Sequence, residues 1–356
     1  MKSKYRRIYK KCLPLLFAIL AFSSCLQEDF DNCPVPGKVL LAPRFTMHTQ
    51  QDSEGMDYVD LFGETARKVD FYIFNDDGIL INHISKEGVF QNGYKEDVSL
   101  LPAGKYRVIT WVNNLGATEL NLTPEENVTH FDDFLLSLKE TRAKAINLKP
   151  EALLYGTASF TVKENIEGNN EVPVELIRDT NKIQVIIRWK DKETKDWCMH
   201  NYHADATRLY LNDNNGTLNF ENAIVGRENW ITYNPKYFTG ESLKQFQEKD
   251  GAATVAAEFH ILRLLKGESN TKINLKELQP DNTEMTVSTL ELMDYIRDYF
   301  ELSGQNYTQE ALDRKETFRI ELLFECKHQS IPEQSWTAVT IVVEGWILVD
   351  NGVVDI

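Results

Sequence analysis

Cys198, His200 and His203 form the densest group of potential metal ligands in the sequence. A thiolate and imidazole rings bind zinc well, but a structural zinc site needs four ligands, commonly supplied by two close Cys or His pairs. No second pair lies near this group, so His260 or Cys326 could complete a site only through the fold. A surface loop is the favoured interpretation, and no metal or other cofactor is predicted.

Motifs for common enzymatic chemistry are missing from the chain. It contains no GxxxxGK[ST] phosphate loop, no G-x-S-x-G nucleophile elbow, no H-E-x-x-H zinc helix and no G-x-G-x-x-G after a predicted strand. The acidic segments 76–78 and 213–216 lack the ligand spacing of an EF-hand, so they are interpreted as turns. The sequence therefore predicts a protein that is not an enzyme.

Cys25 offers a different chemistry, because a cysteine thiol can be acylated. Basic residues within 2–11 lead into the apolar stretch 13–22, and the small residues Ser23 and Ser24 precede the cysteine. As a helix, the apolar stretch would rise about 15 Å, half the thickness of a hydrocarbon core. The segment resembles a bacterial lipoprotein signal, which predicts cleavage between Ser24 and Cys25 and lipid attachment at Cys25. A plain secretory signal with an incidental cysteine is the alternative.

The rest of the chain is strongly acidic. The 356 residues include 39 basic and 54 acidic side chains, for a net charge of −15, and six of the basic ones lie in the first eleven residues. Such a surface repels phosphate backbones, so no nucleic-acid partner is predicted. Glu28 and Asp29 resemble the surface-export tag of lipoproteins in the Bacteroides group, with a simple acidic tether as the alternative. The expected location is the outer membrane, lipid-anchored and surface-exposed.

Cys33, Cys198 and Cys326 remain once residues 1–24 are removed and Cys25 carries lipid. Three cysteines allow one internal disulfide with three possible pairings, and the sequence does not choose among them. Free buried thiols are the alternative to a bridge.

Strands are the dominant prediction from residue 38 onward. Apolar alternation and turn signals predict them at 39–48, 69–74, 79–84, 106–112, 153–162, 174–176, 183–189, 208–211, 217–220, 256–265, 271–275, 318–325 and 336–349. Residues 75–78 and 212–216 are predicted to be hairpin turns between their flanking strands. This pattern favours an all-β fold with a few short helices.

Two helices are predicted. The apolar residues of 131–138 fall at i, i+3, i+4 and i+7, which is the spacing of one helix face. The apolar residues of 290–300 have helical spacing too, and Ser288 with Glu291 is typical of a capping box.

Polarity rises sharply over residues 164–171, which suggests a domain boundary there. The predicted organisation is a signal peptide over 1–24, a lipidated tether over 25–37, an N-terminal β-sandwich over 38–168 and a C-terminal β-sandwich over 169–356.

Short motifs in a defined order resemble the FimB-type fimbrial anchor and minor-subunit family of the type V pilus. The residues that carry the resemblance are Cys25, Cys33-Pro34, 69–74, Asp77-Gly78, 101–106, Trp111, Asn113, 178–183 and Gly345-Trp346. Membership implies tandem transthyretin-like (Ig-like) β-sandwiches and a role at the base of an adhesive fimbria. The implied partners are the major stalk subunit and, through acylated Cys25, the outer-membrane lipid.

In this pilus type, the resemblance implies that stalk subunits lose their first strand to an arginine-specific protease and receive a neighbour's C-terminal strand in its place. An anchor cut in this way would lose its lipid. Residues 49–66, where a cut would release the first strand, contain no Arg or Lys; Arg44 lies inside that strand and Arg67 adjoins the next. We therefore expect the chain to keep its first strand.

Such a subunit could not accept a donor strand, and we expect it to join the fimbria by donating its own C-terminal segment, residues 336–356. Its apolar alternation predicts a strand buried on both faces, for which an ordinary core strand is the alternative. The predicted partner-strand residues are Val339, Ile341, Val343, Trp346 and Leu348.

Two other functions fit parts of the pattern. A surface glycan-binding lipoprotein would use exposed Trp and Tyr rings as stacking platforms, although Trp111, Trp189 and Trp346 lie in predicted strands. A fimbrial tip adhesin is intermediate between the two. A glycan binder predicts exposed aromatic rings on one concave face, whereas an anchor predicts buried tryptophans.

Overall fold

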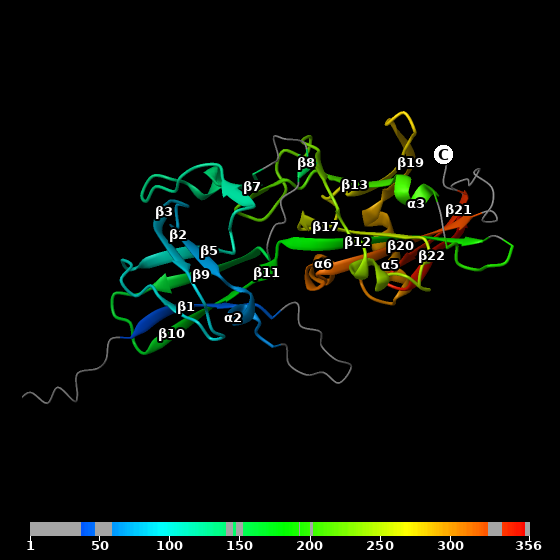
Figure 1. Ribbon diagram of the computed structural model, residues 1–356. Helices are drawn as coiled ribbons and strands as arrows, with labels where there is room; N and C mark the ends of the chain where they lie inside the picture. The colour runs from blue at the N-terminus through cyan, green and yellow to red at the C-terminus, as the bar shows by residue number, and fades with distance from the viewer. Residues whose placement is uncertain are drawn as a thin grey trace, which may run out of the picture.

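The computed structural model describes residues 37–46, 59–139, 145–146, 152–191, 193–199, 202–326 and 337–352. Strands arranged in five sheets dominate these residues (Figure 1). The helices are short: α2 (Phe62–Thr65), the 3₁₀ helix η2 (Phe131–Asp133), α3 (Tyr202–Ala206), α4 (Glu241–Lys244), α5 (Leu292–Leu302) and α6 (Gln309–Arg314). The predicted all-β class is confirmed.

The N-terminal half stacks three sheets. The first sheet is β10 (Asn169–Glu175), β1 (Lys38–Arg44) and β4 (Glu96–Asp97). The central sheet is β11 (Ile177–Arg178), β9 (Leu154–Val162), β5 (Gly104–Val112), β2 (Lys68–Asn75) and β3 (Leu80–Glu87). The third sheet is β14 (Thr217–Asn219), β7 (Leu135–Leu138) and β6 (Thr118–Leu120).

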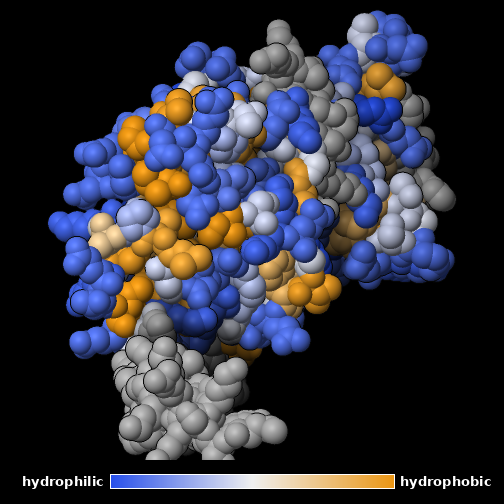
Figure 2. Space-filling model, turned by 90° about the vertical axis from the view of Figure 1, so that its left-hand side faces the viewer, coloured by the Kyte–Doolittle hydropathy of each residue, from blue (hydrophilic) through white to orange (hydrophobic). Residues whose placement is uncertain are grey.

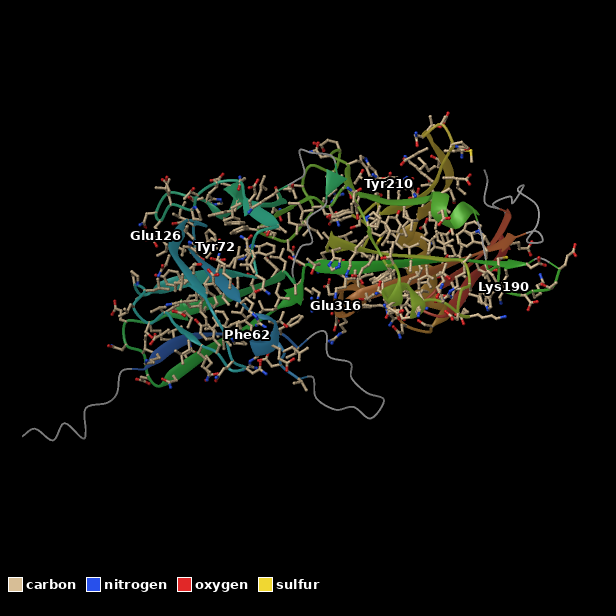
Figure 3. The ribbon with its side chains drawn as sticks, viewed as in Figure 1. Phe62, Tyr72, Glu126, Lys190, Tyr210 and Glu316 are labelled. Carbon is tan, nitrogen blue, oxygen red and sulfur yellow. The ribbon has the colours of Figure 1, made fainter. Side chains whose placement is uncertain are left out.

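The central sheet is buried on both faces. On β2, Phe71 and Ile73 belong to the core shared with the first sheet, and Tyr72 and Phe74 to the core shared with the third. Figure 3 labels Tyr72 on this strand. Burial on both faces explains why four consecutive residues of the strand, 71–74, are apolar. The predicted hairpin between β2 and β3 is confirmed by their antiparallel pairing.

The C-terminal half packs two larger sheets around α5. One is β16 (Lys236–Tyr237), β17 (Thr254–Leu262), β12 (Thr180–Asp191), β20 (Thr317–Cys326), β21 (Thr337–Val343) and β22 (Trp346–Gly352). The other is β19 (Glu284–Glu291), β18 (Lys272–Leu278), β13 (Thr207–Asp213), β15 (Ile231–Tyr233) and β8 (Ala145–Ile146).

The strands that directly follow the predicted boundary between residues 168 and 169 still pair with the N-terminal sheets. β10 pairs in parallel with β1, and β11 pairs with β9, so both belong to the N-terminal sheets. The six-stranded C-terminal sheet begins with β12 at Thr180, whereas the other C-terminal sheet includes the earlier strand β8. The polar segment before β10 is a connection within the first half.

The predicted helix over residues 131–138 is wrong. Phe131–Asp133 is a single 3₁₀ turn and Leu135–Leu138 is a strand. Phe134, Leu136 and Leu138 are buried at every second position, because β7 pairs with both β6 and β14. Tertiary pairing selects the period of two over the helical spacing.

The predicted hairpin around residues 212–216 is also wrong. β13 pairs with β15 and β18, whereas β14 crosses to the N-terminal half and pairs with β7. The intervening residues Asp213, Asn214 and Asn215 are buried. The side chain of Asn215 donates to the carbonyls of Leu262 and Arg263, so this segment is an internal crossing.

Two smaller predictions about helix and strand ends need correction. Helix α5 exists, but Ser288 lies in β19 and Glu291 makes no side-chain cap bond, so the capping box is wrong. The single strand predicted over 336–349 is a hairpin. Glu344 and Gly345 both have positive φ, which makes the two-residue turn between β21 and β22.

Phe220, just after β14, should hold the two halves together. Its ring is buried and stacks on Phe134 with centroids 4.4 Å apart, and the Tyr155 hydroxyl donates to its carbonyl. We expect Phe220→Ala to lower the free energy of unfolding by about 3–5 kcal/mol. Urea titration followed by tryptophan fluorescence measures this, with half-buried Phe131→Ala as the control. An equal loss in both variants would contradict the prediction.

Candidate functional site

β1 is built into the core of the N-terminal half. Val39, Leu41 and Phe45 are buried in the core between the first and central sheets. β1 runs parallel to β10 over its whole length and antiparallel to β4 at Leu40 and Leu41. Removal of β1 would leave an open apolar groove, so its retention decides whether the subunit can accept a foreign strand.

The peptide bond after Arg44 is held by hydrogen bonds on both sides. The carbonyl of Arg44 accepts from the Leu176 N–H at 2.8 Å, and the Phe45 N–H donates to the Asp60 carboxylate at 2.9 Å. The Phe45 carbonyl accepts from the Leu61 N–H at 2.8 Å. A protease must bind its substrate backbone in extended form, and here those backbone groups are already bonded.

Arg67 is secured by the buried side chain of Asn113. The Asn113 amide oxygen accepts from the Arg67 N–H at 2.7 Å, and its nitrogen donates to the carbonyls of Thr65 and Ala152, both at 3.0 Å. Asn113 has a φ of 60°, a conformation that asparagine tolerates better than most residues. Its role was not deduced from the sequence beyond its place in the resemblance.

Arg178 connects β1 to the C-terminal half. Its guanidinium carbon lies 5.4 Å from the centroid of the Phe45 ring, and its Nη2 lies 3.5 Å from the carboxylate of Glu316. Glu316 also pairs with Lys182 at 2.8 Å. Figure 3 shows Glu316 near the middle of the molecule, where the two halves meet. Phe45, which directly follows β1, is therefore linked through Arg178 to Glu316, the residue before β20 in the second half.

A buried polar cluster lies at the same junction. The carboxylate of Asp179 accepts from Asn222 at 2.8 Å and lies 3.9 Å from Arg263, which forms two hydrogen bonds to Asp313 at 2.6 and 2.7 Å. The second oxygen of Asp179 has no hydrogen-bond partner among the described residues. Burial raises the pKa of Asp179 to about 7. Asp179 belongs to the segment 178–183 of the family resemblance, but its partners could not be predicted because they are far apart in the chain.

The predicted partner-strand residues fall in the C-terminal hairpin. In β21, Val339 pairs with Phe324 and Gly352, while Ile341 and Val343 are buried. Trp346 opens β22, and half-buried Leu348 packs against the main core. The structure thus brings these residues into two adjacent strands. The side chains of Val339 and Trp346, like Ser24 and Cys25, lie outside what the structure describes.

The Cys198 segment does not bind zinc through its cysteine. Cys198 is buried and disulfide-bonded, so it offers no thiolate. Within the described residues no group of three potential ligands is placed to hold a metal ion.

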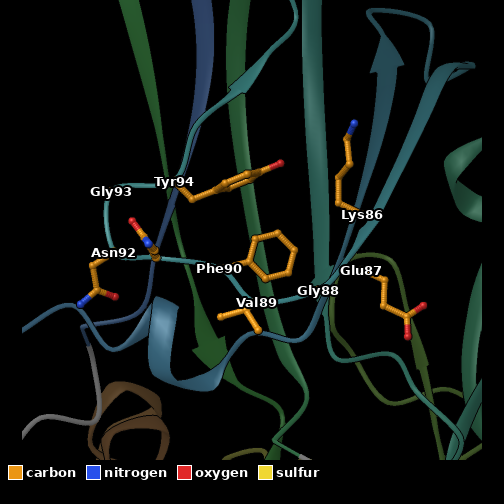
Figure 4. A pocket seen from close by; sticks show the side chains of 9 residues that line it. Lys86, Glu87, Gly88, Val89, Phe90, Asn92, Gly93 and Tyr94 are labelled. Atoms are coloured by element: carbon orange, nitrogen blue, oxygen red, sulfur yellow. The ribbon is translucent and has the colours of Figure 1, made fainter.

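The described aromatic residues divide between the two alternatives. Trp111 and Trp189 are buried, as an anchor predicts, whereas Trp230 is 44% exposed and Tyr237 37% exposed. A hollow of 460 Å³ lies in the loop after β3, but the rings of Phe90 and Tyr94 beside it contact each other with centroids 5.0 Å apart (Figure 4). Figure 2 shows apolar side chains interspersed with hydrophilic ones over this end of the molecule. None of the described helices is long and apolar enough to cross a bilayer.

Stacked β-sandwiches, a first strand built into the core and a C-terminal strand at a sheet edge define a class of two-part β-sandwich proteins. The chain belongs to the family of fimbrillin-A associated anchor proteins Mfa1 and Mfa2, whose model matches residues 30–352. The resemblance found in the sequence is confirmed at this level. A fimbrial subunit role at the cell surface follows from the family.

Solved structures show the same fold. The fimbrial anchor protein Mfa2 from Porphyromonas gingivalis is 19% identical, with a TM-score of 0.64 over 89% of this chain and 100% of that one. A candidate adhesin from Bacteroides ovatus is 21% identical (TM-score 0.69, 90% and 96%). A candidate polysaccharide-binding protein from Bacteroides thetaiotaomicron is 22% identical (TM-score 0.67, 87% and 97%). No curated protein matches the chain in sequence.

Loss of the Asn113 side chain should expose the Arg67 peptide bond. Asn113→Gly keeps the left-handed backbone and removes four side-chain hydrogen bonds, including the one from the Lys68 N–H. We expect cleavage after Arg67 by an arginine-specific protease to become several-fold faster, as measured by the masses of the fragments over time. Asn114→Gly is the matched control, and equal cleavage rates in the two variants would refute the role of Asn113.

Asp179 should make stability depend on pH. Its pKa is raised from 3.8 to about 7 in the folded protein, so the folded state binds this proton more tightly than the unfolded state does. Stability therefore falls as pH rises from about 4 to 7, by at most on the order of 4 kcal/mol. We expect Asp179→Asn to flatten this fall in urea titrations at pH 5 and pH 8. Exposed Asp196→Asn is the control; the prediction fails if the two variants behave alike.

Proposed function

We propose that the chain is a lipid-anchored fimbrial subunit that attaches an adhesive fimbria to the outer membrane. Cleavage between Ser24 and Cys25 and acylation of Cys25 supply the anchor. Strand addition through the C-terminal hairpin, which contains Val339, Ile341, Val343, Trp346 and Leu348, supplies the link to the major stalk subunit. Attachment at this point also ends the fimbria at its base.

The observation that carries the proposal is the buried, hydrogen-bonded position of β1. An anchor transmits force only while its covalent path from lipid to folded body is intact, and that path runs through β1. The bonds around Arg44 and Arg67 protect it at the basic residues flanking the segment whose cleavage would release β1. From Cys25 to Gly37 the chain spans at most about 40 Å, which keeps the body close to the bilayer.

The acidic surface agrees with this placement. Beyond the first eleven residues the chain has 54 acidic and only 33 basic side chains, so lipid rather than charge must hold it on an anionic membrane. Buried Trp111 and Trp189 also favour an anchor over a glycan binder.

Replacement of the lipidated cysteine tests the anchor. We expect Cys25→Ala to move the protein from the membrane fraction to the soluble fraction and to release fimbriae from the cells, because acyl chains supply the membrane affinity. Asn32→Ala is the control, since it changes the tether near Cys25 and leaves the signal and every cysteine intact. The measurements are fractionation, counting of shed fimbriae, and mass spectrometry of the mature N-terminus.

Two outcomes would overturn the anchor. One is Cys25→Ala protein that still sediments with membranes. The other is a wild-type chain that begins after Arg44 or Arg67 and carries no lipid, which would identify a polymerising or tip subunit.

A further inference from the structure

β22 presents backbone groups to the outside of the six-stranded sheet. It pairs with β21 on one side, and no strand among the described residues pairs with its other side. The two-residue turn makes Val343 and Trp346 the closing pair of the hairpin. In such a hairpin the next residue, Ile347, directs its N–H and C=O away from the partner strand.

The other long edge strands carry devices that discourage pairing. β10 contains Pro173 between acidic residues, β19 begins and ends with Glu, and β3 ends in charged residues. The first part of β3 is also covered, because Leu80 exchanges hydrogen bonds with Asn127 and Thr129. Edge strands of the remaining described sheets have two or three residues. Proteins protect edges in these ways to prevent unwanted strand addition.

The first four residues of β22 lack such protection, and Asp350 is its only charged residue. Its first four residues, Trp-Ile-Leu-Val, are apolar, and the side chain of Ile347 is 60% exposed. Ile347 lies opposite half-buried Val342 on the outward face of the sheet, and half-buried Leu323 is on that face too. An exposed apolar edge is costly for a secreted protein unless a partner covers it.

We propose that a strand of the stalk subunit adds to the outer edge of β22 while the hairpin stays in its own sheet. This rests on the proposed function and specifies its contact. Ile341 and Val343 are buried, and β21 pairs on both sides. Detachment of the hairpin would expose those side chains and open the edge of β20, so addition to β22 is the route that keeps the core intact.

The charged side chains of α5 indicate which side chains the partner strand should carry. α5 packs against β22 and β21 and carries exposed Asp294 and Glu301, with a single Arg297 paired to Asp294 and Asp298. The added strand should therefore place apolar side chains beside Ile347 and basic side chains toward α5.

Single substitutions at the edge test the contact in the full-length protein in cells. We expect Ile347→Lys, and Ile347→Pro, which removes an outward N–H, to reduce the stalk subunit that co-purifies with the protein by about tenfold or more. Met285→Lys is the matched control, because Met285 is a 41% exposed apolar residue of the edge strand β19. The stalk subunit is quantified by mass spectrometry. Undiminished co-purification with Ile347→Lys, or an equal loss with Met285→Lys, would overturn the proposal.

A disulfide staple separates edge addition from detachment of the hairpin. Leu323 and Thr340 are opposite each other on β20 and β21, so Leu323→Cys with Thr340→Cys would lock the hairpin in place. The stapled protein should still capture the stalk subunit, and loss of capture only under oxidising conditions would disprove the edge contact. If wild-type protein captures no stalk subunit, the proposed function fails as well; if Cys25 is lipidated and capture survives Ile347→Lys, only the edge contact fails.

Discussion

Burial of the central sheet on both faces is the constraint on which the rest of the structure depends. One face is covered by the sheet that contains β1, so the first strand cannot leave without exposing Phe71, Ile73 and their neighbours. The other face is covered by β7 and by β14, which comes from the second half of the chain. The same requirement thus retains the strand next to the tether and joins the two halves into one continuous core.

The junction adds specificity to this apolar packing. Asp179 and Arg263 are buried, and their hydrogen bonds reach Asn222 after β14 and Asp313 in α6. A buried charge that loses its partner is strongly destabilising, whereas apolar contacts tolerate sliding. The cluster therefore fixes how the two halves meet.

Local signals were enough for some elements and not for others. The β2–β3 hairpin and the two faces of β5 could be predicted because their turn glycine and alternation lie within a few residues. β7 could not, because Phe134, Leu136 and Leu138 fit a strand and residues 131–138 also fit a helix, and the distant β14 decides between them. Asn113 and Asp179 were visible only as members of a family pattern, since their partners at Ala152 and Arg263 are remote in sequence. Gly345 is a local turn signal, but the apolar residues on both sides of it led to the prediction of one continuous strand over 336–349.

The two halves of the molecule differ in whether their sheets can accept another strand. The groove that a foreign strand would need is filled by the chain's own β1, and the long edges β3, β10 and β19 carry charges or proline. In Figure 1, β1 and β22 lie at opposite ends of the molecule. A stalk subunit needs two complementary surfaces to continue a fibre, whereas a subunit with one filled groove and one open edge can join at one end alone. On the proposed function, the same retained strand that keeps the lipid attached also ends polymerisation, so anchoring and termination have one structural cause.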